Sequence, residues 1–263
     1  MINEIIKLRG PENDSVTLTT YILDDIRGHI PYRPAIVICP GGGYQRCSNI
    51  EAEPVAMRFA AAGFHAFVLN YSVYPCRYPD ALEELSMSVE LIRENAEKWH
   101  VDKDKIAVGG FSAGGHLAAS LGVFWNKEPF ASETQKNKPN ALVLCYPVIT
   151  SGELGHRGSF DALCGDDAEL VEKMSLEKRV DKDTPKTFLW HTFDDEGVMV
   201  DNSLLFANAL RKNDIPFEMH IYPTGRHGLS LINKDTGLED GEVVSENAKQ
   251  WIDNCCSWLL ENM

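Results

Sequence analysis

The chain has 263 residues, 44% of them hydrophobic and 24% charged, a composition typical of a soluble globular protein with one α/β domain or two small ones. Its formal net charge of -14 repels phosphate backbones and excludes nucleic acid as an expected partner. No stretch approaches the roughly 20 apolar residues of a membrane-spanning helix. Residues 1–10 lack the features of a secretion signal. We therefore expect a cytoplasmic protein that does not contact membranes.

The sequence contains seven cysteines, and no two of them have the C-x-x-C spacing of a metal or redox site. Cys39 and Cys145 lie in apolar runs, where cysteine acts as a small hydrophobic residue. The neighbours Cys255 and Cys256 are expected to pack in a helix. Reduced thiols fit a cytosolic protein, and we expect neither a metal nor another cofactor.

Apolar runs of strand length alternate with amphipathic helical segments along the chain. The strands are expected at residues 4–8, 15–23, 34–39, 64–69, 106–108, 141–146, 187–192 and 217–222. The helices are expected at 53–62, 79–99, around 116–121, at 202–212 and around 251–260. This alternation predicts a mostly parallel sheet of about eight strands with helices on both faces.

Two segments depart from the alternation. Residues 126–140 are polar, contain two prolines and are expected to form a surface connection. Residues 150–184 contain only a short predicted helix around 168–174. We interpret this second segment as an insertion after the sixth strand, within a single domain over residues 1–263. Ligands of such sheets bind beyond the carboxyl ends of the strands, so functional residues are expected there.

The segment from Gly110 to Gly114, with the sequence Gly-Phe-Ser-Ala-Gly, matches the G-x-S-x-G pattern of a nucleophile elbow. A strand must turn sharply into a helix here, and side chains at the flanking positions would collide with that turn. Ser112 is then exposed as a candidate nucleophile, with the Ala113 N–H at the helix start. The alternative is a glycine-rich turn with an incidental serine.

A glycine loop follows the strand that ends at Cys39. Its backbone N–H groups, with that of Ala113, are candidates for an oxyanion hole that binds the negative charge formed during acyl transfer. Gly42 and Gly43 are the preferred donors. A tight glycine turn without catalytic function is the alternative.

A serine nucleophile needs a base, and the base needs an orienting carboxylate. His227 is the preferred base, because it lies on a glycine-flanked loop after the last strand. Asp195 is the preferred carboxylate, in the acidic loop after the seventh strand. Asp194 is its main alternative, and Glu196 and Asp201 are also open.

The order Ser112, Asp195, His227 is that of the α/β hydrolases. The chain resembles the esterase/lipase group of this superfamily, and within it the small intracellular acetyl-xylan-esterase-like "sugar hydrolases". The similarity is carried by CPGGGY at 39–44, EAEPVA at 51–56, FVLNYS at 67–72, GGFSAGGH at 109–116, YPVI at 146–149, FLWHTFDDEGV at 188–198, NSLLFANAL at 202–210 and GRHGLSL at 225–231.

The resemblance implies an α/β-hydrolase fold and a serine esterase that removes short acyl groups, acetyl above all, from sugars such as xylo-oligosaccharides. Pro40 stands where the lipase/esterase pattern has histidine, which leaves open whether Gly42, Gly43 or Tyr44 donates the N–H. The side chains of Tyr44 and His156 are candidates for substrate contact. A homo-oligomer is possible.

Two other functions remain open at this point. A peptidase of the prolyl-oligopeptidase type has the same catalytic domain, although this chain has no N-terminal region large enough for a propeller. A non-catalytic binding protein on the same fold is the second alternative. Binding alone does not require serine, aspartate and histidine together, which favours the enzyme.

Overall fold

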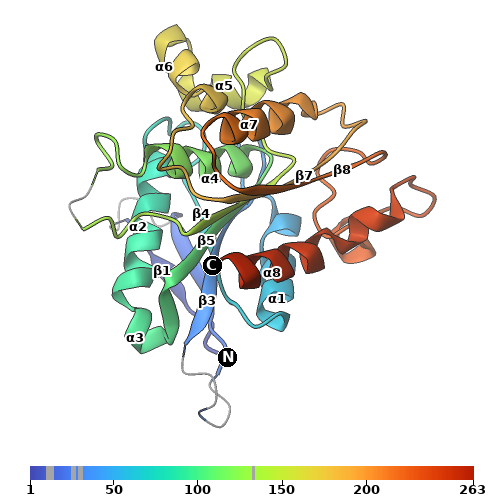
Figure 1. Ribbon diagram of the computed structural model, residues 1–263. Helices are drawn as coiled ribbons and strands as arrows, with labels where there is room; N and C mark the ends of the chain where they lie inside the picture. The colour runs from blue at the N-terminus through green and yellow to red at the C-terminus, as the bar shows by residue number, and fades with distance from the viewer. Residues whose placement is uncertain (10–14, 25–27, 29–31, 132–133) are drawn as a thin grey trace.

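The structure is a computed structural model that describes residues 1–9, 15–24, 28, 32–131 and 134–263. One eight-stranded sheet runs through it in the order β1-β2-β4-β3-β5-β6-β7-β8 (Figure 1). The strands are β1 (Ile5–Lys7), β2 (Thr17–Tyr21), β3 (Arg33–Cys39), β4 (His65–Asn70), β5 (Val101–Phe111), β6 (Ala141–Cys145), β7 (Thr187–Thr192) and β8 (Phe217–Tyr222). β2 pairs antiparallel with both β1 and β4, and every other pair of neighbours in the sheet is parallel. The predicted mostly parallel sheet is confirmed.

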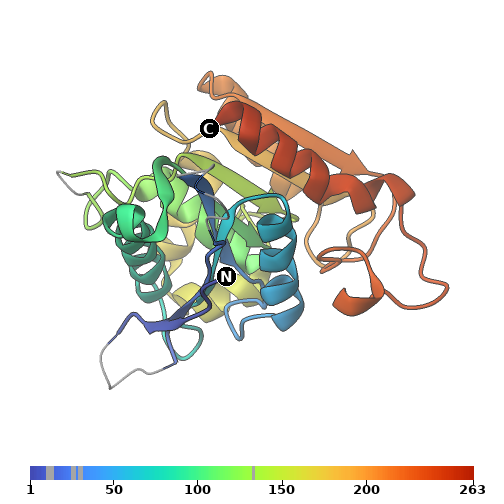
Figure 2. The ribbon, with the colours of Figure 1, turned by 90° about the horizontal axis from the view of Figure 1, so that it is seen from below.

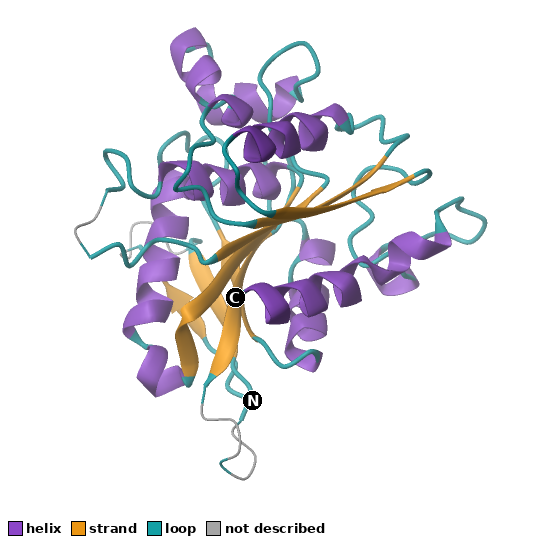
Figure 3. Cartoon of the chain, in the orientation of Figure 1, coloured by secondary structure: helices purple, strands orange, loops and turns teal. Residues whose placement is uncertain are grey.

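Helices cover both faces of this sheet (Figure 3). The α-helices are α1 (Glu53–Ala61), α2 (Asp80–Glu94), α3 (Ala96–Trp99), α4 (Ala113–Phe124), α5 (Arg157–Cys164), α6 (Ala168–Lys173), α7 (Asp201–Lys212) and α8 (Trp251–Asn262). Short 3-10 helices are η1 (Asn49–Glu51), η2 (Leu176–Lys178), η3 (Lys234–Thr236) and η4 (Glu246–Gln250). α1 and α8 lie on one face, and α2, α4 and α7 lie on the other (Figures 1 and 2). Within the described residues, no helix combines the length and the hydropathy of a transmembrane span.

The continuous apolar run of β3 is buried on both faces of the sheet, as a central parallel strand requires. Ile36 and Ile38 pack into the core beneath α1 and α8. Val37 and Cys39 point the other way, into the core beneath α2 and α4. Burying each large aliphatic side chain contributes roughly 1.5–3 kcal/mol, so the two cores fix the position of this strand firmly.

The helix predicted over residues 79–99 is interrupted and forms α2 and α3. Asn95 lies at the break, where its side-chain amide donates a hydrogen bond to the Leu91 carbonyl oxygen at 2.8 Å. Asparagine side chains that bond to nearby backbone groups compete with helical hydrogen bonding, which explains the interruption.

The segment 150–184 contains α5 as well as α6, whereas the sequence predicted a helix only around 168–174. α5 begins after His156, whose ring nitrogen accepts a hydrogen bond from the Ser159 N–H. Histidine is not among the usual N-cap residues, so this start was not recognised. The segment lies against α4 and α7 through η2. In the expected connection 126–140, residues 132 and 133 lie outside the described residues.

The parallel register brings five strand ends to one edge of the sheet. Cys39 of β3 pairs with Gly110 of β5, and Phe111 pairs with Cys145 of β6. Cys145 pairs with Trp190 of β7, and β7 continues alongside β8 to its last residue. The loops that follow these strands therefore meet, although they are far apart along the chain.

Candidate active site

Ser112 occupies a sharp turn between β5 and α4, with φ 53° and ψ -119°. Positive φ values are strained for residues other than glycine and persist only where the surroundings impose them. Here the close approach of the two elements imposes it. A Cβ atom at Gly110 would lie 2.0 Å from the Gly114 carbonyl oxygen, and one at Gly114 would lie 2.1 Å from the Cys39 carbonyl oxygen. Both positions therefore require glycine.

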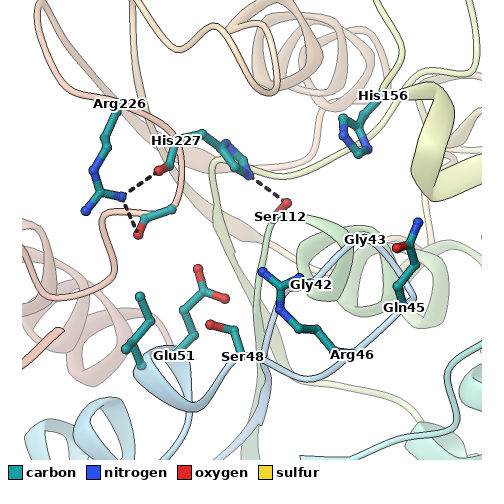
Figure 4. A pocket seen from close by; sticks show the side chains of 12 residues that line it. Gly42, Gly43, Gln45, Arg46, Ser48, Glu51, Ser112, His156, Arg226 and His227 are labelled. Atoms are coloured by element: carbon teal, nitrogen blue, oxygen red, sulfur yellow. Dashed lines mark hydrogen bonds between the residues drawn. The ribbon is translucent and has the colours of Figure 1, made fainter. Parts of the chain in front are cut away.

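The structure brings the preferred serine, histidine and aspartate into one hydrogen-bonded chain. Ser112 Oγ lies 2.8 Å from His227 Nε2. Figure 4 marks this hydrogen bond with a dashed line. His227 Nδ1 lies 2.7 Å from Asp195 Oδ2. With the carboxylate ionised, Nδ1–H donates to Asp195 and Nε2 accepts the Ser112 hydroxyl proton. The histidine is thus oriented to remove a proton from the serine.

Asp195 is buried and accepts several hydrogen bonds. Its Oδ1 accepts the N–H groups of Gly197 at 2.8 Å and Val198 at 2.9 Å. Burial alone would raise the pKa of this carboxyl, but hydrogen bonds from His191, His227 and the Val198 backbone outweigh it and hold the pKa below its usual value. The residue is therefore ionised at neutral pH.

The alternative carboxylates do not point to His227. Asp194 is exposed, and its Oδ1 accepts the Gly225 N–H at 2.7 Å. Glu196 is exposed on the same loop, and Asp201 begins α7. Among the four candidates, the geometry selects Asp195.

His191 was predicted only as part of a strand, yet it lies beneath Asp195. Its Nε2 is 2.8 Å from the Val198 carbonyl oxygen and 3.3 Å from Asp195 Oδ2. Its Nδ1 is 2.8 Å from Ser203 Oγ. The Ser203 hydroxyl donates to Nδ1, so that Nε2–H faces the carboxylate. A polar residue at the end of a buried strand was the signal that could have found it.

The glycine loop after β3 has its carbonyl groups hydrogen-bonded within the protein. The Gly41 carbonyl oxygen accepts the Ser48 N–H at 2.9 Å, and that of Gly42 accepts the Gln45 N–H at 3.0 Å. The Pro40 carbonyl oxygen accepts the Tyr71 hydroxyl at 2.6 Å. These bonds fix the orientation of the peptide units that carry these three carbonyl groups.

The N–H groups of the loop are arranged differently. Within the described part of the chain, the N–H groups of Gly42, Gly43 and Ala113 have no acceptor. Gly42 has φ 132° and Gly43 has φ 67°, conformations that suit glycine. Both glycines and Ser112 line the same cavity. Unpaired N–H groups beside a candidate nucleophile match the geometry expected of an oxyanion hole.

The prediction that the Tyr44 side chain contacts the substrate is corrected by its position. Tyr44 is buried, and its hydroxyl lies 2.9 Å from His116 Nδ1. His116 Nε2 lies 3.0 Å from the Met174 carbonyl oxygen, and burial lowers the pKa of His116 to about 4. The neutral imidazole therefore accepts the Tyr44 proton. Tyr44 was a candidate for substrate contact because its aromatic ring directly follows the glycine loop, but here it packs beneath the loop.

A cavity of about 450 Å³ opens beside Ser112 (Figure 4). His156, the other candidate for substrate contact, lies on its wall, with Nδ1 2.8 Å from Ser159 Oγ. The other side chains of the wall are mainly polar. The lining residues are Gly42, Gly43, Gln45, Arg46, Ser48, Ile50, Glu51, Ser112, His156, Arg226, His227 and Gly228.

Comparison with known proteins adds independent information. Residues 28–210 match the BD-FAE family. The chain is 39% identical over 238 residues to endo-1,4-beta-xylanase B of Butyrivibrio fibrisolvens, covering 85% of this chain and 36% of that protein. It is 29% identical over 209 residues to the acetylxylan esterase of Xylanibacter ruminicola, covering 76% and 42%. The chain thus spans less than half the length of these two relatives.

A solved structure matches over nearly the full length. The acetyl ester-xyloside bifunctional hydrolase from Caldicellulosiruptor lactoaceticus is 38% identical, with a TM-score of 0.84, and the match covers 98% of this chain and 96% of that one. The chain therefore belongs to the BD-FAE family and has the α/β-hydrolase fold. The predicted resemblance to α/β-hydrolase esterases and sugar hydrolases is confirmed.

Replacement of Gly114 by alanine tests the crowding beneath the elbow. The added Cβ would meet the backbone carbonyl oxygen of Cys39, so β3 or α4 must move. We expect Gly114→Ala to lower the free energy of unfolding by roughly 3 kcal/mol, measured by urea denaturation with circular dichroism. Gly158→Ala in α5 is the control, since its Cβ would meet only the His156 side chain at 3.5 Å. Equal midpoints for the two variants would contradict the argument.

Proposed function

We propose that the chain is a serine esterase that removes short acyl groups, acetyl above all, from sugars such as xylo-oligosaccharides. The observation that carries the proposal is the hydrogen-bonded chain from Ser112 through His227 to Asp195, with unpaired N–H groups on the same cavity. These parts correspond to the nucleophile, base, orienting carboxylate and oxyanion hole of acyl transfer.

In the proposed mechanism, His227 accepts the Ser112 proton while Oγ attacks the ester carbonyl carbon. The N–H groups of Gly42, Gly43 and Ala113 stabilise the oxyanion, and each such donor is worth about 10²–10³ in rate. His227 then protonates the alcohol oxygen as the ester C–O bond breaks, and the acyl group stays bound to Ser112 Oγ. A water molecule releases the acid by the same steps in reverse, with His227 as its base.

The lining of the cavity supports a sugar ester with a short acyl group. Gln45, Ser48 and His156 offer hydrogen-bonding groups that suit hydroxyls, whereas Ile50 is the large aliphatic side chain among the lining residues. Such a wall provides little apolar surface for a long acyl chain. The acetylxylan esterase and the acetyl ester-xyloside hydrolase among the similar proteins agree with this substrate class.

Ser112→Ala should lower the turnover of 4-nitrophenyl acetate by at least about 10³-fold, because the attacking oxygen is removed. Labelling by a fluorophosphonate probe should disappear as well, since the probe reacts only with an activated serine. Ser257 is exposed on α8 and does not line the cavity, so Ser257→Ala should retain full activity and labelling. Equal turnover by Ser112→Ala and wild type would refute the proposal.

A comparison of Asp195→Asn with Asp194→Asn tests which of the two carboxylates orients His227. An amide at this position donates towards Nδ1 of His227 and favours the wrong imidazole tautomer, so kcat should fall on the order of 10³–10⁴-fold. Asp194→Asn should stay within about tenfold of wild type, because its carboxylate only holds the Gly225 N–H. Steady-state kinetics with 4-nitrophenyl acetate measure both. The reverse ranking would assign the role to Asp194.

A further inference from the structure

Glu51 is a buried carboxylate at the active-site cavity that the mechanism above does not use. It ends η1 and is only 3% exposed, yet it lines the cavity beside Ser112 and His227 (Figure 4). A buried charge is strongly unfavourable unless hydrogen bonds compensate for the lost water. Its contacts therefore indicate what the residue does.

The two oxygens of Glu51 connect separate loops of the site. Oε2 accepts the Gly41 N–H at 2.8 Å, one residue before the proposed oxyanion donors. Oε1 accepts the Tyr146 hydroxyl at 2.6 Å, at the end of β6. The Tyr146 oxygen in turn accepts the Ser230 N–H at 2.9 Å, three residues after His227. One carboxylate thus joins the glycine loop, the end of β6 and the histidine loop.

Tyr146 also contacts the imidazole directly. Its ring lies edge-on to that of His227, with centroids 5.1 Å apart and an interplanar angle of 72°. Tyr146 has φ 37° and Ser230 has φ 49°, both in the region that is strained for residues with a side chain. Strained residues keep such conformations only where surrounding bonds hold them. The hydrogen bonds that begin at Glu51 help to hold these two, together with backbone and side-chain bonds from neighbouring elements.

The glycine loop also packs closely against the Glu51 carboxylate. A Cβ atom at Gly41 would lie 2.8 Å from Glu51 Oε2 and 3.0 Å from Ser112 Cβ. The carboxylate therefore touches the loop at the point where it passes the serine. Burial raises the pKa of Glu51 above its usual value, although the hydrogen bonds that Tyr146 and Gly41 donate to its oxygens act in the opposite direction.

We propose that Glu51 is a positioning residue for ester hydrolysis, which aligns the glycine loop and His227 with Ser112 through Gly41 and Tyr146. This inference rests on the proposed function. Oxyanion donors act on the charge that develops in the transition state, so their alignment affects kcat. A displacement of about 1 Å in such groups can lower the rate by roughly 10²-fold. Glu51 itself need not touch the substrate.

The test is Glu51→Gln, which keeps the shape but replaces one acceptor oxygen by an amide that faces a donor. We expect kcat for 4-nitrophenyl acetate to fall about 10–100-fold, with KM within about threefold of wild type. Tyr146→Phe removes the link between Glu51 and Ser230 and should lower kcat likewise. The double variant should be no slower than the slower single variant, because the two residues act as one unit.

Glu84 provides a matched control for a purely structural role. It is also fully buried, and its carboxylate accepts the Ser72 N–H at 2.7 Å and the Ser72 hydroxyl at 2.6 Å. It also accepts Arg9 Nε at 2.8 Å and does not line the active-site cavity. Glu84→Gln should lower the urea midpoint as much as Glu51→Gln does, while kcat per folded molecule stays unchanged.

Three results would overturn the inference: an unchanged kcat in Glu51→Gln, a loss confined to KM, or an equal loss of kcat in Glu84→Gln. Additive losses in the double variant would also contradict it. If the proposed function itself is wrong, the result differs from all of these: the wild-type protein would neither hydrolyse acetyl esters nor react with a fluorophosphonate at Ser112.

Discussion

The turn at Ser112 is the constraint on which the rest of the site depends. β5 lies between β3 and β6 in the sheet, and α4 must start directly above the end of β3. That start is possible only because Gly110 and Gly114 carry no side chain. Crowding then forces Ser112 into its positive φ and holds its hydroxyl at the edge where the other strands end. The free energy gained by burying the apolar cores on both faces of the sheet offsets the cost of this strain.

The polar side chains around the site are oriented by networks of consecutive hydrogen bonds. Ser203 orients His191, His191 faces Asp195, and Asp195 orients His227. On the other side, Glu51 and Tyr146 join the glycine loop to the histidine loop. Such connected networks are rigid because each buried group has its partner, and a missing member leaves its neighbour unsatisfied. Preorganisation of this kind is what acyl transfer requires.

Local patterns in the sequence predicted the strands, most helices and the serine elbow, because each depends on residues close together along the chain. The elbow motif and the loops after the strand ends pointed to Ser112, Asp195 and His227, and the structure joins these three side chains by hydrogen bonds. Glu51 was not recognised as part of the site, since its bond to Tyr146 spans 95 positions. The prediction that the Tyr44 side chain contacts the substrate was wrong for the same reason. Its partner His116 is 72 positions away, and nothing near the glycines indicates burial.

The proposed base and the proposed nucleophile follow strands that have different numbers of neighbours in the sheet. Ser112 follows a central strand, whereas His227 follows β8, which pairs with β7 alone among the described strands. Peripheral elements open locally at a lower free energy than the centre of a domain. Moderate heating would therefore separate the histidine from the serine while the interior remains folded. We therefore expect catalytic inactivation and global melting of this protein to be two distinct transitions.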